Sequence, residues 1–227
     1  MGTIALAGGN EFRPNCITMD RQILACIPKP APRVVILPTA AVRGSPRMAA
    51  DNGVRHFTAL GAQATAVMVI TREDAQNPAY VQAIADADLI YLAGGEPPYL
   101  LNVLRDTPLW DAILAIPARG GILAGSSAGA MVLAAKMRAR GMDGDWIDAL
   151  NIVPKVVVIP HHQQSKRAAI QALQREKNLA ILGIDEATAC ISEDLQQWTV
   201  VGAGSVTVYL KDGITRYAAD RPFVLPA

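Results

Sequence analysis

A serine in a tight turn bounded by glycines is the residue of this sequence best suited to chemistry. Ser127 lies in Gly125-Ser126-Ser127-Ala128-Gly129, a G-x-S-x-G pattern between an apolar run and an Ala-rich stretch. A nucleophile at such a strand-to-helix turn needs small neighbours, because the backbone there is cramped. The N–H groups and the dipole at the start of the following helix would stabilise an oxyanion. A simple capping role for Ser127 is the alternative interpretation.

Histidines and carboxylates follow two other apolar runs. His161 and His162 come after one run, and Asp185 and Glu186 come after the next. In an open α/β sheet, ligands bind beyond the carboxyl ends of the strands. A hydroxyl, an imidazole and a carboxylate at that edge are the three groups of a nucleophile–base–orienter relay. This joint placement predicts acyl-transfer chemistry at Ser127.

Other segments bear on the same site. The glycines of Gly94-Gly95-Glu96 allow a backbone N–H to approach a substrate carbonyl closely. Gly8-Gly9-Asn10 lacks a nucleotide-binding pattern, so we expect it to line the site. Asp145, in an irregular stretch, is a second candidate for the carboxylate, and His56, inside a helical pattern, is expected to be structural.

Composition excludes several classes of partner. The net charge is +1 with interspersed charges, so neither nucleic acid nor a membrane is an expected partner. No apolar run approaches the roughly 20 residues of a membrane-spanning helix. No cluster has metal-ligand spacing, so we expect no metal and no cofactor. The three cysteines have no CxxC pairing, which favours reduced thiols in a cytoplasmic protein.

The elements that must position these residues alternate between strands and helices. The predicted strands are apolar on both faces, as in a covered parallel sheet; they are Thr3–Ala7, Arg33–Leu37, Ala64–Ile70, Leu89–Ala93, Gly121–Ala124, Lys155–Ile159 and Ala180–Ile184. The predicted helices are Pro46–Leu60, Pro78–Ala85, Pro97–Leu104, Ser127–Met137 and Ser165–Lys177. The alternation predicts an α/β fold, a doubly wound and mostly parallel sheet.

The end of the chain has a different pattern. Its last strands are separated by Gly202-Ala203-Gly204 and Lys211-Asp212-Gly213, which are turn signals. They predict a small C-terminal antiparallel meander on the sheet edge, and residues 1–227 are expected to form a single domain.

An α/β-hydrolase places its acid before its histidine. Here the best acid follows His161, and no histidine follows His162, which disfavours an esterase or lipase.

Beyond the serine turn, longer motifs are similar to one known family. The chain resembles the dipeptidase E and cyanophycinase family of serine peptidases, whose fold is flavodoxin-like and similar to class I glutamine amidotransferases. The similarity spans nearly the whole chain and rests on four segments, which are Ile36-Leu37-Pro38-Thr39-Ala40, Ile90-Tyr91-Leu92-Ala93-Gly94-Gly95-Glu96, Gly125-Ser126-Ser127-Ala128-Gly129-Ala130 and Gly183-Ile184-Asp185-Glu186-Ala187-Thr188-Ala189.

The resemblance implies a role for each member of the site. It implies Ser127 as nucleophile, His161 as base and Glu186 as the carboxylate, with oxyanion donors from the backbone N–H groups of Gly95 and Ala128. Amidotransferase relatives carry Cys at the turn, so Ser127 argues against glutaminase chemistry. The implied mechanism is peptide hydrolysis through an acyl-enzyme.

Departures from the family pattern bear on the substrate. In this family the catalytic histidine is commonly followed by an aromatic residue, whereas this chain has His162 at that position. In cyanophycinases several arginines come next, and of these only Arg167 is clearly present in this chain. Glu96 replaces the Asp of their Gly-Gly-Asp-Gln. We therefore expect Glu96, His162 and Arg167 to contact a small peptide substrate, with dipeptides bearing N-terminal Asp as one interpretation. A cyanophycinase-like exopeptidase acting on β-aspartyl-arginine peptides, and a non-catalytic binding module, are the alternatives. The oligomeric state is left open between a monomer and a homo-oligomer.

Overall fold

An eight-stranded, mostly parallel sheet forms the centre of the computed structural model, which describes residues 2–139, 145–164, 167, 170–171, 174 and 179–225. The strand order is β14-β11-β10-β1-β5-β4-β2-β3. Five strands run parallel; they are β1 (Thr3–Ala7), β2 (Arg33–Leu37), β3 (Gln63–Ala66), β4 (Leu89–Leu92) and β5 (Ile122–Ser126). Three antiparallel strands extend the sheet beyond β1, namely β10 (Thr188–Ser192), β11 (Gln197–Gly202) and β14 (Pro222–Val224).

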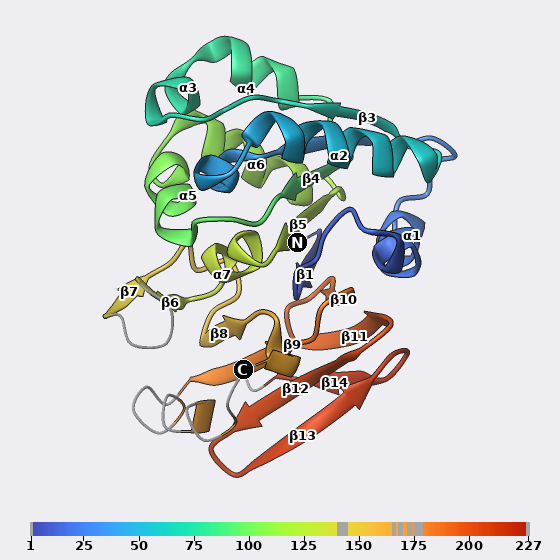
Figure 1. Ribbon diagram of the computed structural model, residues 1–227, viewed down its shortest axis with the longest axis vertical. Helices are drawn as coiled ribbons and strands as arrows, with labels where there is room; N and C mark the ends of the chain where they lie inside the picture. The colour runs from blue at the N-terminus through green and yellow to red at the C-terminus, as the bar shows by residue number, and fades with distance from the viewer. Residues whose placement is uncertain are drawn as a thin grey trace.

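A second sheet lies at the end of the molecule opposite helices α3 (Arg72–Gln76) and α4 (Pro78–Ile84) (Figure 1). Its order is β13-β12-β9-β8, with β8 and β9 parallel and the other pairs antiparallel. Its strands are β8 (Val156–Ile159), β9 (Ala180–Ile184), β12 (Ser205–Leu210) and β13 (Gly213–Ala218). A separate hairpin consists of β6 (Lys136–Arg138) and β7 (Trp146–Asp148).

Helices cover both faces of the central sheet. Alternate residues of β1 enter different cores, because successive side chains of a strand point to opposite faces. Ala5 and Ala7 pack in the core with α1 (Ile17–Ala25) and α2 (Pro46–Ala59). Ile4 and Leu6 belong to the core on the other face, with α3 (Arg72–Gln76), α4 (Pro78–Ile84), α5 (Pro97–Leu104), α6 (Pro108–Ala118) and α7 (Ala128–Leu133). Short 3₁₀ segments are η1 (Pro14–Cys16), η2 (Thr39–Arg43) and η3 (His162–Gln164).

Helix starts follow their capping residues. The Ser45 side chain accepts a hydrogen bond from the Met48 N–H at the start of α2, and Thr107 accepts one from Trp110 at the start of α6. Thr71 and Asp74 form a reciprocal capping box on α3. Such caps satisfy N–H groups that have no partner inside the helix, and proline at the first position of α2, α4, α5 and α6 has no N–H to satisfy.

The predicted α/β class with a mostly parallel sheet is confirmed. Strands β1, β2 and β9 and helix α5 have the predicted bounds. The predicted helix Ser127–Met137 is too long, since α7 ends at Leu133. Ala134 is extended and bridges Val153, so pairing with a distant segment overrides the helix propensity of the Ala-rich run. The predicted helix Ser165–Lys177 lies largely outside the described residues, and α1, α6 and β10 lie outside the predicted elements.

The predicted antiparallel strands at the end of the chain are present, but they do not all pair in sequence order as a meander. Gly202-Ala203-Gly204 does not close a hairpin, because β11 joins the central sheet and β12 pairs with β9 in the second sheet. Two hydrogen bonds join the β11–β12 connection to the loop after β9. The Ala203 N–H donates to the Ala187 carbonyl, and the Ser205 N–H donates to the Asp185 carboxylate. The turn Lys211-Asp212-Gly213 does connect the antiparallel pair β12–β13. Among the described residues, the helices are all too short or too polar to cross a membrane.

Candidate active site

Ser127 occupies the sharp turn between β5 and α7. Its φ is 49° and its ψ is −109°, a conformation that side-chain-bearing residues rarely adopt. The turn needs glycine on both sides, because a Cβ on Gly125 would lie 2.4 Å from the Gly129 backbone, and one on Gly129 would lie 2.2 Å from the Leu92 carbonyl oxygen. The Ser127 N–H donates to the Ala7 carbonyl at 3.0 Å. The turn thereby holds the half-buried Ser127 hydroxyl in a fixed position above the strand ends.

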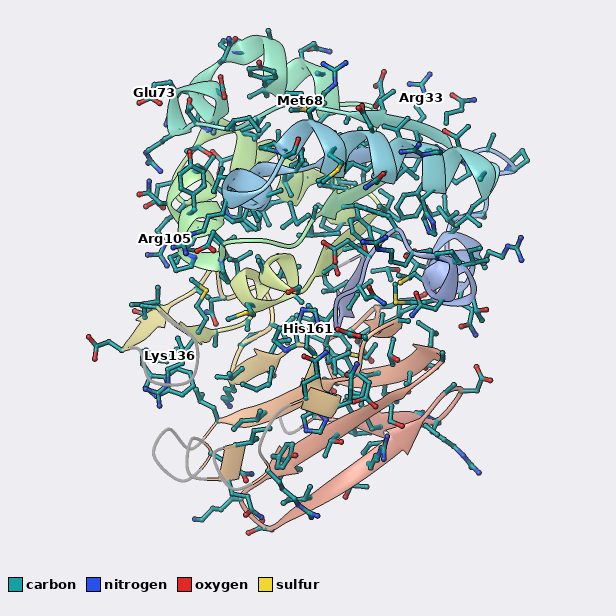
Figure 2. All side chains as sticks on the ribbon, viewed as in Figure 1. Arg33, Met68, Glu73, Arg105, Lys136 and His161 are labelled. Carbon is teal, nitrogen blue, oxygen red and sulfur yellow. The ribbon has the colours of Figure 1, made fainter. Side chains whose placement is uncertain are left out.

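His161 brings its imidazole to this hydroxyl from the end of β8. Its Nε2 lies 3.1 Å from Ser127 Oγ, within hydrogen-bond distance. The residue has a φ of 51°, and its N–H donates to the Gly8 carbonyl at 2.8 Å. The ring packs directly on Gly9, where a Cβ would lie 2.3 Å from the imidazole Cε1. Figure 2 places His161 between the central sheet and the second sheet.

Glu186 completes the chain of hydrogen bonds from the end of β9. Its Oε1 lies 2.7 Å from His161 Nδ1. A carboxylate oxygen can only accept, so this contact places the ring proton on Nδ1 and leaves Nε2 free to accept from the Ser127 hydroxyl. The two side chains are 38% and 27% exposed, so a molecule in solution can reach them.

Gln163 and Gln164 hold Glu186 from the 3₁₀ segment that follows His161. Gln164 Nε2 donates to Glu186 Oε1 at 3.1 Å, and the Glu186 N–H donates to Gln163 Oε1 at 2.9 Å. Neither glutamine was among the residues that the sequence pattern singled out for the relay. Their only signal was their position directly after the two histidines.

Backbone donors lie beside the serine turn. Gly95 is exposed with a φ of 143°, and a Cβ there would lie 2.0 Å from the Ala40 carbonyl oxygen. Within the described part of the chain, its N–H is not used in a hydrogen bond. Ala128 is the first residue of α7, so its N–H has no partner inside the helix. Both N–H groups can therefore donate to a bound oxygen.

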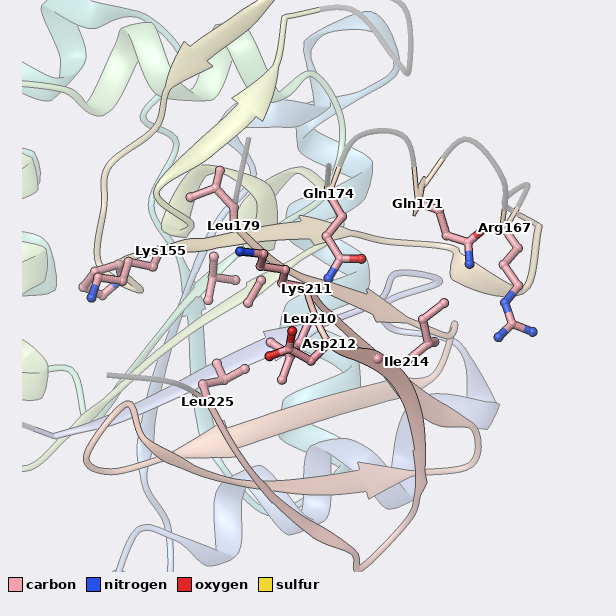
Figure 3. Close-up of a pocket in the computed structure, with 14 residues that line it drawn as sticks. Lys155, Arg167, Gln171, Gln174, Leu179, Leu210, Lys211, Asp212, Ile214 and Leu225 are labelled. Atoms are coloured by element: carbon pink, nitrogen blue, oxygen red, sulfur yellow. The ribbon is translucent and has the colours of Figure 1, made fainter. Parts of the chain in front are cut away.

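Among the described residues, the other charged side chains predicted for the site form no hydrogen bond with Ser127, His161 or Glu186. Glu96 is the N-terminal cap of α5 and pairs with Arg43 at 3.0 Å. Asp145 is exposed at the β6–β7 hairpin, and its carbonyl accepts from Ala139. Arg167 is exposed and lines a cavity of about 970 Å³ together with Lys155 and Lys211 (Figure 3). The cavity adjoins the starts of β8 and β9, whereas His161 and Glu186 follow the ends of these strands.

His162 faces the second sheet instead of the serine. Its Nε2 is 2.8 Å from the Tyr209 hydroxyl and its Nδ1 is 3.4 Å from Asp185. A Cβ on Gly183 would lie 2.3 Å from this ring. Burial lowers the pKa of His162, against the opposing effect of Asp185. Both nitrogens are engaged, so the placement argues against contact with a substrate.

Asp20 of α1 and His56 of α2 form a buried polar pair. His56 Nε2 is 2.7 Å from Asp20 Oδ2, and both side chains are buried, in line with the structural role predicted for His56. Burial raises the pKa of Asp20, with the His56 contact opposing it. Burial also raises the pKa of Cys16 to about 12, so this thiol stays protonated at neutral pH and cannot act as a nucleophile.

Glu11 is a further residue of the site that the sequence pattern did not indicate. Gly8-Gly9-Asn10 lines the site as expected, since Gly8 and Gly9 contact His161. The next residue, Glu11, accepts hydrogen bonds from the Gly94 N–H at 2.7 Å and from the Ser126 hydroxyl at 2.9 Å. Among the described residues, His, Cys, Asp and Glu form no group that could hold a metal ion.

Comparisons with known proteins agree with one another. A family model described as "Peptidase family S51" matches residues 3–198. The cyanophycinase of Geminocystis herdmanii is 28% identical over 242 residues, covering 98% of this chain and 88% of that protein. The cyanophycinase of Trichormus variabilis is 31% identical over 188 residues, which cover 77% of this chain and 62% of that protein.

Solved structures extend the similarity to the whole fold. The crystal structure of a peptidase from an acI-B1 actinobacterium has a TM-score of 0.86 and 30% sequence identity, covering 99% of this chain and 97% of that one. A putative peptidase E protein from Listeria monocytogenes has a TM-score of 0.59 at 16% identity, with 95% and 98% of the chains covered. The second likeness concerns the fold alone.

Proposed function

This chain belongs to peptidase family S51 and is a serine peptidase, and we propose that Ser127, His161 and Glu186 carry its reaction on small peptides. The observation that supports this assignment is the continuous chain of hydrogen bonds, 3.1 Å from Ser127 Oγ to His161 Nε2 and 2.7 Å from His161 Nδ1 to Glu186 Oε1. Each group is of the type and in the order that a nucleophile, its base and the orienter of the base require.

Acylation begins at the serine hydroxyl. His161 Nε2 takes the hydroxyl proton while Ser127 Oγ bonds to the carbonyl carbon of the scissile peptide bond. The carbonyl oxygen becomes an oxyanion, which accepts hydrogen bonds from the N–H groups of Gly95 and Ala128. Glu186 stabilises the imidazolium. The tetrahedral intermediate then breaks its C–N bond, and His161 gives the proton to the leaving amine.

Deacylation repeats these steps with water. His161 removes a proton from a water molecule, whose oxygen attacks the ester carbon of the acyl-enzyme. The C–Oγ bond breaks, and the proton on His161 returns to Ser127. The products are a carboxylic acid and an amine, and Ser127 is free again.

Small peptides are the proposed substrate class, with dipeptides bearing N-terminal Asp as the leading candidate. The exposed guanidinium of Arg167 is the cation proposed for the acidic side chain, although it lines the cavity at the starts of β8 and β9 and not the strand ends that carry His161 and Glu186. The second candidate is a β-aspartyl-arginine peptide, favoured by similarity to a cyanophycinase over 98% of this chain. Against it, Gln163 and Gln164 are bound to Glu186 in the segment where cyanophycinases carry arginines.

Hydrolysis of a defined peptide panel tests the proposal. The purified protein would be assayed with Asp-Leu, Ala-Leu, Leu-Leu and β-Asp-Arg by the release of free amino acid, alongside Ser127→Ala. We expect turnover of at least one peptide, reduced on the order of a millionfold in the variant. Wild-type turnover by Ser127→Ala would exclude Ser127 as nucleophile. A protein that neither cleaves the panel nor reacts with a fluorophosphonate would instead be a non-catalytic binding module.

A further inference from the structure

The Glu11 carboxylate connects two parts of the site that are far apart in the sequence. Its Oε1 accepts from Gly94, 83 residues away, and its Oε2 accepts from Ser126, 115 residues away. These partners lie next to Gly95 and Ser127, respectively. We propose that Glu11 is a positioning residue that keeps the oxyanion donor of Gly95 aligned with the serine turn. This inference rests on the proposed function, since it assumes an oxyanion at that place.

The Gly95 N–H belongs to a peptide unit held between two anchored neighbours. On one side, the Gly94 N–H donates to Glu11; on the other, the Glu96 N–H donates to the Ala40 carbonyl at 2.8 Å. Two consecutive glycines would otherwise leave this segment free to rotate. Because the peptide planes on both sides are held, the position of the Gly95 nitrogen is set before substrate binds, and its N–H can turn only by coupled rotation of the Gly94 ψ and the Gly95 φ.

The serine turn is held by the same carboxylate. Ser126, the last residue of β5, is buried, and its hydroxyl donates to Glu11 Oε2 at 2.9 Å. Ser127, the next residue, is anchored through its N–H to Ala7. A carboxylate has two oxygens that only accept, which suits one side chain to receive a backbone N–H and a hydroxyl at once.

Glu11 also fits tightly against the turn that it holds. A Cβ on Gly94 would lie 2.5 Å from Glu11 Oε1 and 3.2 Å from the Ser127 Cβ. Only glycine at 94 therefore leaves room for the carboxylate. This closeness allows one other role, since a carboxylate near the serine could receive the ammonium group of a peptide with a free N-terminus.

Two substitutions of Glu11 distinguish these roles. Glu11→Ala removes both contacts. Glu11→Gln keeps them, because its amide oxygen can accept from Gly94 and its NH₂ can donate to the Ser126 oxygen, while the negative charge is lost. Ser126→Ala removes one contact, and Glu193→Ala, at an exposed position, is the matched control. Ser127→Ala tests the proposed function separately.

The readouts are the rate of fluorophosphonate labelling, kcat and KM with Asp-p-nitroanilide, and thermal unfolding. Glu11→Ala should label roughly 10- to 100-fold more slowly and lose kcat with little change in KM, because a donor misplaced by about 1 Å can cost on the order of 100-fold. Ser126→Ala should lose roughly three- to tenfold, by the same reasoning applied to one contact. Glu11→Gln and Glu193→Ala should stay within about threefold of the parent enzyme.

Two results would overturn the inference. One is labelling and kcat at the parent rate in Glu11→Ala, or in Ser126→Ala if Glu11→Ala does not fold. The other is a Glu11→Gln enzyme that labels normally but loses Asp-p-nitroanilide turnover, since the fluorophosphonate carries no ammonium; Glu11 would then contact the substrate. Labelling of Ser127→Ala at the parent rate would refute the proposed function itself.

Discussion

Gly9 offers a way to displace the His161 ring without changing any member of the relay. In Gly9→Ala, the new Cβ would lie 2.3 Å from the imidazole Cε1 and 2.7 Å from Nε2. Ordinary van der Waals contact begins at 3.4 Å, so the ring must move by about 1.1 Å. A movement of that size breaks the 3.1 Å contact to Ser127 Oγ or the 2.7 Å contact to Glu186.

The expected loss of activity follows from that displacement. A misplacement of about 1 Å costs on the order of 100-fold in rate, so fluorophosphonate labelling should slow by at least that factor. Gly9 has a φ of 113°, so the methyl group also strains the backbone, by roughly 1–3 kcal/mol. For a chain of this size, that corresponds to a fall in Tm of roughly 2–12 °C.

A second glycine separates these two effects. Gly61 has a φ of 93°, and a Cβ there would meet no atom within 4 Å. Gly61→Ala should therefore lose stability by backbone strain but label at the parent rate. The assay is the second-order labelling rate of both variants beside their thermal unfolding. Parent-rate labelling by Gly9→Ala, or an equal loss in Gly61→Ala, would show that contact of residue 9 with the His161 ring does not control the reaction.

Three further predictions concern neighbouring side chains. Glu186→Gln should lower kcat at least about tenfold with little change in KM, because the imidazolium loses its counter-charge; the same effect in Asp145→Asn alone would transfer the role to Asp145. Burial lowers the pKa of His162 below its usual 6.5, so below that pH the unfolded chain binds a proton that the folded chain does not, and stability must fall as the pH falls. His162→Gln should therefore lose less Tm between pH 7 and pH 5 than the parent protein, and an identical pH dependence would exclude this effect. Arg167 is exposed, so its pairing with a substrate carboxylate is worth about 1 kcal/mol or less; Arg167→Ala should lower kcat/KM for Asp-p-nitroanilide by up to about fivefold and spare Leu-p-nitroanilide, and equal losses on both would remove the acidic-substrate preference.

The meeting of Ser127, His161 and Glu186 was predictable because each follows an apolar strand. Buried strands are recognised in a sequence as short apolar runs, so the residues that follow each run mark a strand end. Parallel strands bring their carboxyl ends to the same edge of a sheet. The three residues lie near one another although β8 and β9 belong to a second sheet. The position of a strand end does not separate the roles of His161 and His162, because the directions of these adjacent side chains depend on packing of one ring against Gly9 and of the other against Gly183.

The division into two sheets could not be predicted, because it depends on pairing between distant segments. The run after Gly204, which is β12, has the pattern of a strand. That it pairs with β9 and not with β11 depends on contacts to the loop after β9. Glu11 was missed for the same reason. Its partners are distant in sequence, and no local motif predicts that a carboxylate will accept hydrogen bonds from a backbone N–H and a buried hydroxyl.

The role of Ser127 as nucleophile is tested most directly by identifying the residue that a fluorophosphonate modifies. The treated protein would be digested, and its peptides sequenced by mass spectrometry, for the parent chain, Ser127→Ala and His161→Gln. We expect one phosphonylated residue, Ser127, with no adduct in Ser127→Ala and much slower labelling in His161→Gln. An adduct on another residue, or undiminished labelling in Ser127→Ala, would contradict the assignment of Ser127 as nucleophile.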